Sequence, residues 1–157
     1  MTVITQFGVK ILRERMESLR TEMKNVMDEM KDVRDSSLSS EDNTETHEYN
    51  QRYDSLQKQY TELKNIMSNA TVVDVTTIPT DKITVGSVVT LINVDTDQEF
   101  IYRLVGSVES DPSNGMISYT SPIGKEMMGL TVDDGFDINI GGKEVEYEIK
   151  SIEVKPL

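Results

Sequence analysis

Hydrophobic residues recur at alternating steps of four and three along the first half of the chain, the spacing of a helix that buries one stripe. The first run comprises Leu12, Met16, Leu19, Met23, Val26, Met30 and Val33. The second run comprises Tyr49, Tyr53, Leu56, Tyr60, Leu63 and Met67. We therefore predict two helices, the first from about Thr5 to Arg34, that pack as an antiparallel coiled-coil hairpin with these seam residues between them.

A polar segment, Asp35 to His47, separates the two runs and holds no seam residue. It carries Glu41, Asp42, Glu45 and the only histidine of the protein. Because the helices are expected to run antiparallel, this tip segment is placed at the far end of the hairpin. A helix of that length is roughly 40 Å long and must project from so small a protein.

The second half of the chain has the alternating, β-branched texture of strands from residue 72 onward. Strand-like runs begin near residues 83, 99, 116, 135 and 144, with turn residues between them. Ser121 and Pro122 open a short helix that extends to Met128, with serine as N-cap and proline in its first turn. We predict an α+β protein with a coiled-coil hairpin over residues 1–75, followed by a small antiparallel β-sheet domain with a short helix over residues 76–157.

Composition narrows the class of protein. The formal net charge is −12 and the pI about 4.5, which argues against independent binding of duplex DNA because phosphate binding requires clustered lysine and arginine. No apolar run approaches the roughly 18 residues of a membrane span, and no cysteine is present to form disulfides. We expect a cytoplasmic protein without membrane contact, and a monomer. The charge has a plain alternative interpretation, which is solubility alone.

Conventional catalytic sets are missing from the sequence. A Ser-His-Asp triad would have to use His47, thiol chemistry is excluded, and Gly141-Gly142 lacks the lysine of a phosphate-binding loop. The tip segment alone has chemical content, because carboxylate oxygens are ligands that Mg²⁺ prefers. Its ligands are too few for a closed metal site, so Glu41 and Asp42 could only share a metal held by another molecule. The plain alternative is a solvated turn in which Asp42 caps the returning helix.

Three further motifs carry a resemblance to a known family. They are Met67 to Asp74 (MSNATVVD), Tyr102 to Gly106 (YRLVG), and Ser118 to Lys125 (SYTSPIGK), the last continuing to Gly129. Over nearly its full length the chain resembles the bacterial Gre factors, especially those of the GreA type. The resemblance implies an FKBP-like C-terminal domain that docks on the rim of the secondary channel of RNA polymerase, while the hairpin brings its tip to the active site.

The resemblance also implies the activity, that of a transcript-cleavage and elongation factor. Tip carboxylates of the family help to hold the second Mg²⁺ of the polymerase, which then cleaves the backtracked 3′ end of the nascent RNA. The factor is thus an activator and not itself an enzyme, and it needs no cofactor of its own. The resemblance further implies a docking segment formed by Ser121, Pro122, Ile123, Lys125, Met127 and Met128. The plain alternative for this segment is a cap and core contact within the domain.

The tip matches the family pattern in part. Asp42, Asn43, Glu45 and His47 fall on family positions, whereas the family aspartate is Ser39 here. A hydroxyl holds Mg²⁺ less well than a carboxylate does. Glu41 is an additional acid that could substitute for the missing one.

Three functions therefore compete. The first is a cleavage factor that uses Asp42, Glu41 and Glu45, with Asn43 and Ser39 beside them. The second is a Gre-like paralogue that occupies the channel and regulates or inhibits polymerase without efficient cleavage, for which Ser39 is the clue. The third is an adaptor or chaperone-like hairpin unrelated to transcription.

Overall fold

The computed structural model describes residues 2–36 and 43–156, with the backbone alone for residues 43–45. The chain divides into two compact units. One is Leu12–Asn69, and the other joins Met1–Ile11 to Ala70–Leu157. We refer to them as the hairpin unit and the sheet unit.

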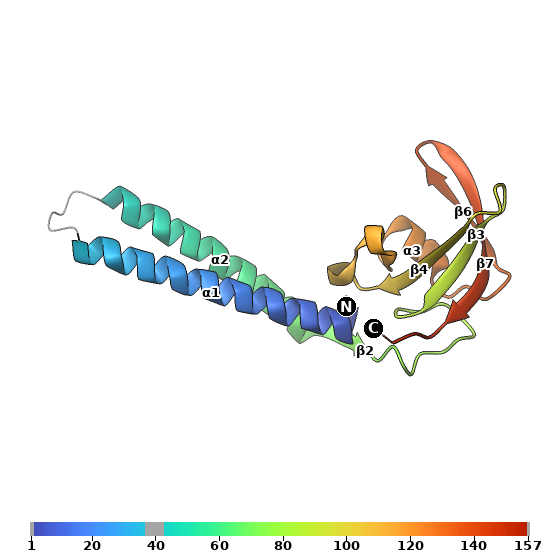
Figure 1. The fold of residues 1–157 in the computed structure, drawn as a ribbon, viewed down its shortest axis with the longest axis horizontal. Helices are drawn as coiled ribbons and strands as arrows, with labels where there is room; N and C mark the ends of the chain where they lie inside the picture. The colour runs from blue at the N-terminus through green and yellow to red at the C-terminus, as the bar shows by residue number, and fades with distance from the viewer. Residues whose placement is uncertain (1, 37–42, 157) are drawn as a thin grey trace. The chain divides into compact units, whose positions relative to one another are not determined.

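The hairpin unit is built from two long helices that lie side by side (Figure 1). Helix α1 spans Gln6–Ser36, with its first turns in the sheet unit, and helix α2 spans Asn43–Asn69. Every predicted seam residue on both helices is buried or half-buried, whereas nearly all the residues between them are exposed. The predicted pair of helices and its buried stripes are therefore confirmed.

The sheet unit contains a five-stranded sheet in the order β5-β4-β3-β7-β6. Its strands are β3 (Val88–Asn93), β4 (Glu99–Val105), β5 (Met116–Ser118), β6 (Gly135–Ile140) and β7 (Lys143–Glu153). Helix α3 spans Pro122–Met127 between β5 and β6 (Figure 1). This arrangement confirms the α+β class and the predicted short helix.

One pairing departs from the predicted antiparallel sheet. Strands β4 and β5 are parallel, with Arg103 opposite Met116 and Val105 opposite Ser118, so the sheet is mixed. Two short 3-10 helices, η1 (Ser107–Glu109) and η2 (Pro112–Asn114), connect β4 to β5. This connection brings the chain back along β4 to the level of Arg103 before β5 begins, which a hairpin turn cannot do.

The core of the sheet unit lies on one face of the five strands. It contains Ile83, Val89, Leu91, Leu104, Ile117, Met127, Phe136, Tyr147, Ile149 and Ile152. Phe100 and Tyr102 of β4 stack at 6.1 Å between ring centroids and pack against this cluster. Partial burial of the Tyr102 hydroxyl raises the pKa of that group, and the nearby Tyr147 raises it further.

A second, two-stranded sheet joins the beginning of the chain to the segment after the hairpin. Strand β1 (Thr2–Thr5) pairs in parallel with β2 (Ala70–Val73), so that Ile4 lies opposite Val72. Because of this pairing the first residues belong to the sheet unit. The compact units therefore differ from the predicted division into residues 1–75 and 76–157.

Among the described residues, no helix combines the length and the apolar character needed to cross a bilayer.

Candidate functional site

The predicted site at the hairpin tip is described only at its edges. Ser39, Glu41 and Asp42 lie outside the described residues. Helix α1 ends at Ser36, and α2 begins at Asn43, so Asn43 and Glu45 belong to the first turn of the returning helix. The four N–H groups of a first turn have no partner within the helix, and the positive end of the helix dipole lies there, so the backbone at this end of α2 favours nearby negative charge.

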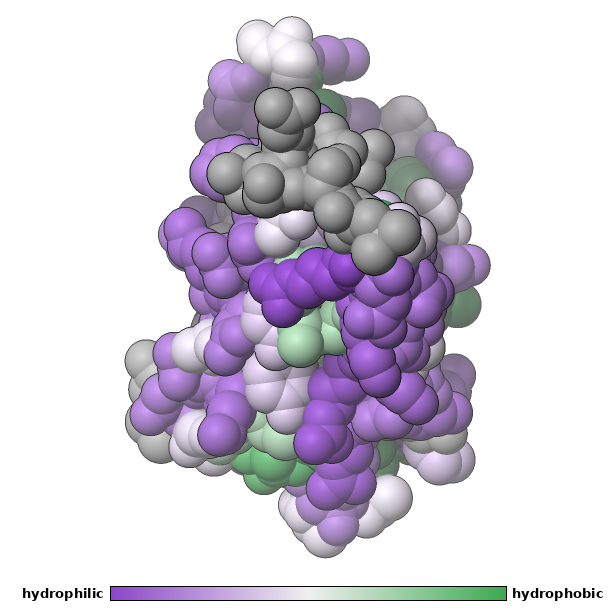
Figure 2. All heavy atoms as spheres, turned by 90° about the vertical axis from the view of Figure 1, so that its left-hand side faces the viewer, coloured by the Kyte–Doolittle hydropathy of each residue, from purple (hydrophilic) through white to green (hydrophobic). Residues whose placement is uncertain are grey.

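His47 lies within the same end of α2, where it is exposed. Its Nε2 is 3.0 Å from the Nε2 of Gln51, one turn further along the helix. Residues four apart lie on the same face of a helix, so this is a contact between neighbouring side chains of α2. The surface turned to the viewer in Figure 2 is mostly hydrophilic, as expected for helices whose apolar residues face each other.

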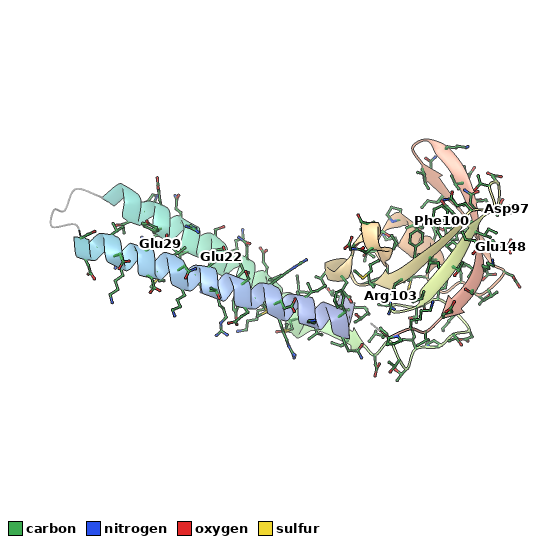
Figure 3. All side chains as sticks on the ribbon, in the orientation of Figure 1. Glu22, Glu29, Asp97, Phe100, Arg103 and Glu148 are labelled. Atoms are coloured by element: carbon green, nitrogen blue, oxygen red, sulfur yellow. The ribbon has the colours of Figure 1, made fainter. Side chains whose placement is uncertain are left out.

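The hairpin that carries the tip is held mainly by its apolar seam. Val26 is 1% exposed, and Leu12, Met30 and Leu56 are also buried. Polar contacts also cross between the helices: Arg52 Nη1 lies 3.7 Å from Glu29 Oε2, and the Arg20 guanidinium lies 6.0 Å from the Tyr60 ring centroid. Figure 3 shows Glu29 on α1. The side chains of Arg52, Glu29 and Arg20 are exposed, and such surface pairs contribute little beside the seam.

The docking segment, Ser121–Met128, has a defined local geometry. The Ser121 hydroxyl accepts a hydrogen bond from Gly124 N (3.1 Å) and donates one to Ser118 O (2.7 Å). Pro122 occupies the first turn of α3, where its missing N–H is not needed. The sequence prediction of a serine cap followed by proline is confirmed.

Exposure separates the members of the docking segment. Pro122 and Lys125 are exposed, and Met128 is 38% exposed. Met127 is 0% exposed and belongs to the core, and Ile123 packs partly against the same core. Because α3 turns the Met127 side chain toward the sheet, this residue makes the core contact that the sequence analysis named as the alternative.

The motif Tyr102 to Gly106 is part of the domain's framework. Arg103 Nη1 donates to Lys155 O (2.9 Å) and its Nη2 donates to Pro156 O (3.1 Å), so it ties the last described residues to β4 (Figure 3). Partial burial lowers the pKa of Arg103. Gly106 is buried beside Glu109 and donates to its carboxylate. No sequence pattern singles out Glu109, because its other partners lie about a hundred residues earlier in the chain.

Comparison with known proteins identifies the family. A model described as transcription elongation factor, N-terminal, matches residues 2–72, and one described as transcription elongation factor, GreA/GreB, C-term, matches residues 78–154. The chain belongs to the GreA/GreB family. Both the hairpin and the sheet unit thus fall within matched parts of this family.

Two curated relatives of the family illustrate the similarity. The GreA transcription elongation factor of Helicobacter hepaticus is 41% identical over 102 residues, which are 65% of this chain and 63% of the relative. That of Aliarcobacter butzleri is 39% identical over 99 residues, 63% of this chain and 62% of the relative. The alignments thus span less than two thirds of these GreA proteins.

Solved structures of GreA/GreB relatives align over most of the chain. GreA factor homolog 1 of Thermus thermophilus aligns over 98% of this chain and 99% of its own, with a TM-score of 0.44 and 21% identity. A GreA/GreB factor of Nitrosomonas europaea aligns over 97% of this chain and 98% of its own, with a TM-score of 0.44 and 19% identity.

Proposed function

We propose that this chain is a transcription elongation factor that binds RNA polymerase at the secondary channel and stimulates the polymerase's own cleavage of backtracked RNA. The observation that carries the proposal is that family models for both parts match in order, over residues 2–72 and 78–154. A hairpin alone would fit many partners. A hairpin joined to a GreA/GreB C-terminal domain favours RNA polymerase as the partner.

In this proposal the sheet unit docks through the exposed members of the docking segment. Pro122 offers a rigid apolar contact, Met128 an adaptable one, and Lys125 a positive charge. The N-cap bond from Gly124 to Ser121 holds the start of α3 in place. Ser121 therefore supports the docking surface, and Ile123 and Met127 pack beneath it.

The hairpin supplies carboxylates to a reaction that the polymerase performs. Asp42 and Glu41 would share the second Mg²⁺ of the polymerase, while Glu45, Asn43 and Ser39 offer hydrogen bonds to the attacking water. The oxygen of water bonds to phosphorus, and the bond from phosphorus to the 3′ oxygen breaks. The retained RNA gains a 3′-hydroxyl with a proton from water, and the released fragment keeps a 5′-phosphate.

The chain is an activator in this scheme, with a cytoplasmic site of action and no catalytic metal of its own. Its net charge of −12 fits this division of roles, because clustered phosphate-binding cations are not required of a factor that contacts RNA within another protein. We propose that it acts as a monomer.

A second candidate function follows from Ser39. If a hydroxyl at the family's aspartate position holds Mg²⁺ too weakly, the chain would occupy the channel as a regulator without efficient cleavage. The two candidate functions differ in whether RNA is cleaved, and both require docking on the polymerase.

The test uses halted elongation complexes with end-labelled RNA, to which the purified chain is added over a range of concentrations. Binding together with stepwise shortening of the RNA 3′ end supports the cleavage factor. Binding without shortening supports the regulator. The absence of binding to polymerase would contradict both functions. If the docking segment is correctly assigned, K125E should weaken binding to polymerase. K143E, on the β6–β7 hairpin, is the matched charge-reversal control and should bind as wild type does.

A further inference from the structure

One buried carboxylate has no part in the proposed docking or cleavage. Glu109 ends the 3-10 helix η1, and it is 2% exposed within the sheet unit. Burying an ionisable side chain is costly unless hydrogen bonds satisfy it, so its partners indicate what the carboxylate is for.

Those partners lie at the beginning of the chain. Thr5 N donates to both carboxylate oxygens, at 3.3 Å to Oε1 and 3.1 Å to Oε2, and Gly8 N donates to Oε1 at 3.1 Å. The Thr5 hydroxyl also donates to Oε1. Gly106 N, three residues before Glu109, donates to Oε2 at 3.0 Å. Glu109 thus joins the end of β1 and the first turn of α1 to the turn after β4.

The first turn of α1 requires this partner. A helix begins with N–H groups that lack partners, and a carboxylate near them is favourable. Helix α1 has no acidic residue in its own first turn, although the Thr5 hydroxyl accepts from Phe7 N (3.1 Å). Glu109, 101 residues further along the chain than Gly8, supplies the missing negative charge.

Two glycines make the approach possible. A Cβ built on Gly8 would lie 2.7 Å from Cδ of Glu109. One built on Gly106 would lie 2.4 Å from the Val3 carbonyl oxygen and 2.7 Å from Oε2 of Glu109. A side chain at position 106 would collide with backbone, and one at position 8 would displace the Glu109 carboxylate from its donors. The two glycines therefore leave room for the carboxylate on both sides.

We propose that Glu109 is a positioning residue of the factor, which fixes the start of α1 on the sheet unit. Helix α1 is continuous from Gln6 to Ser36, so the same helix whose first turn Glu109 holds leads toward the tip. The inference rests on the proposed function, because positioning matters only if the tip must reach a defined place. Glu109 touches no reacting atom and acts through α1.

The informative substitution is Glu109→Gln, which keeps the shape and removes the charge. Both carboxylate oxygens accept from backbone N–H groups, so an amide must place its NH₂ against a donor whichever way it turns. Glu144→Gln, at an exposed position of β7, is the matched control. Thr5→Val is a second variant, which removes only the hydroxyl contact and leaves the carboxylate in place.

Two measurements test the proposal. Amide hydrogen exchange in E109Q is expected to rise about tenfold or more at Thr5 and Gly8, with β6 and β7 unchanged, and to rise less in T5V. In the RNA-shortening assay, the rate at saturating E109Q is expected to fall about fivefold or more, while the half-saturating concentration stays within about twofold of wild type. E144Q should match wild type in both measurements.

The outcomes separate the two proposals. Unchanged hydrogen exchange in E109Q and T5V would overturn the proposal that Glu109 fixes the start of α1. Faster exchange with a wild-type rate at saturation would overturn the positioning role, as would a change confined to the half-saturating concentration. Should E109Q fail to fold, T5V alone decides by the same criteria. A wild-type chain that binds polymerase and shortens no RNA would overturn both the cleavage function and the positioning role. The hydrogen-exchange result would still show whether Glu109 holds the start of α1 in place.

Discussion

Gly124 lies so close to Ser118 that a Cβ built on the glycine would be 2.0 Å from the Ser118 carbonyl oxygen. The same oxygen accepts a hydrogen bond from Ser121 N (3.0 Å) and one from the Ser121 hydroxyl (2.7 Å). The end of β5 and the first turn of α3 are therefore pressed together over one carbonyl group. Any side chain at position 124 must separate them.

Gly124→Ala is expected to destabilise the protein by about 1–3 kcal/mol, as other overpacked sites do. Gly135→Ala is the control, because a Cβ there would meet its nearest atom at 3.4 Å, an ordinary contact. Chemical denaturation of both variants measures the difference. A Gly124→Ala protein as stable as the control would contradict the close packing of α3 on β5.

The hairpin offers a neighbouring pair of residues for testing its seam. Val26 is 1% exposed and Met27 is 46% exposed. Val26→Ala is expected to cost about 2 kcal/mol, because it removes buried methyl groups and leaves a cavity, while Met27→Ala should stay within about 0.5 kcal/mol of wild type. Helix unfolding followed by circular dichroism gives both values. Equal losses would mean that the two helices meet along a different stripe.

Asp74, exposed after β2, provides a test in acid. Hydrogen bonds from the Thr76 hydroxyl (2.6 Å) and Thr76 N (2.9 Å), with a further one from the Gln6 side chain, lower the pKa of Asp74 below 3.8. A lowered carboxyl pKa adds stability above pH 3.8, and that stability is lost as pH falls through the folded pKa. NMR titration should show an Asp74 midpoint below 3.8.

Thr76→Val removes the largest of these causes, so the Asp74 pKa is expected to rise while the remaining N–H contact keeps it below 3.8. Thr77→Val is the matched control, since the Thr77 hydroxyl donates to the backbone oxygen of Asp74 and not to its carboxylate. A midpoint that moves equally in both variants would show that the hydroxyl of Thr76 is not the cause.

Local patterns predicted much of the fold. The seam from Leu12 to Val33 fits only a helical period, and the Ser121-Pro122 start of α3 follows from cap chemistry alone. Strand β1 escaped prediction because its four residues pair with β2, whose partner positions lie beyond the whole hairpin. The parallel β4–β5 pair was hidden for a related reason, since the returning connection is made of 3-10 turns without a strong pattern.

The roles of residues in the candidate sites also depend on packing that local sequence patterns do not reveal. Met127 and Met128 are equivalent in the sequence, and only the packing of α3 decides that the first is buried and the second exposed. Glu109 gave no signal because its meaning depends on Thr5 and Gly8, which the fold brings to it. The tip carboxylates Glu41 and Asp42 remain predictions from the sequence and its resemblance to the family.

The rate of RNA 3′-end shortening in halted elongation complexes, with the factor at saturating concentration, tests the role of the tip most directly. Asp42→Asn keeps the side chain's size and removes the charge that would share Mg²⁺, and Asp54→Asn, on the exposed side of α2, is the control. The account predicts a loss of about tenfold or more in D42N, with binding to polymerase and the D54N rate unchanged. Equal rates for D42N and wild type would contradict it.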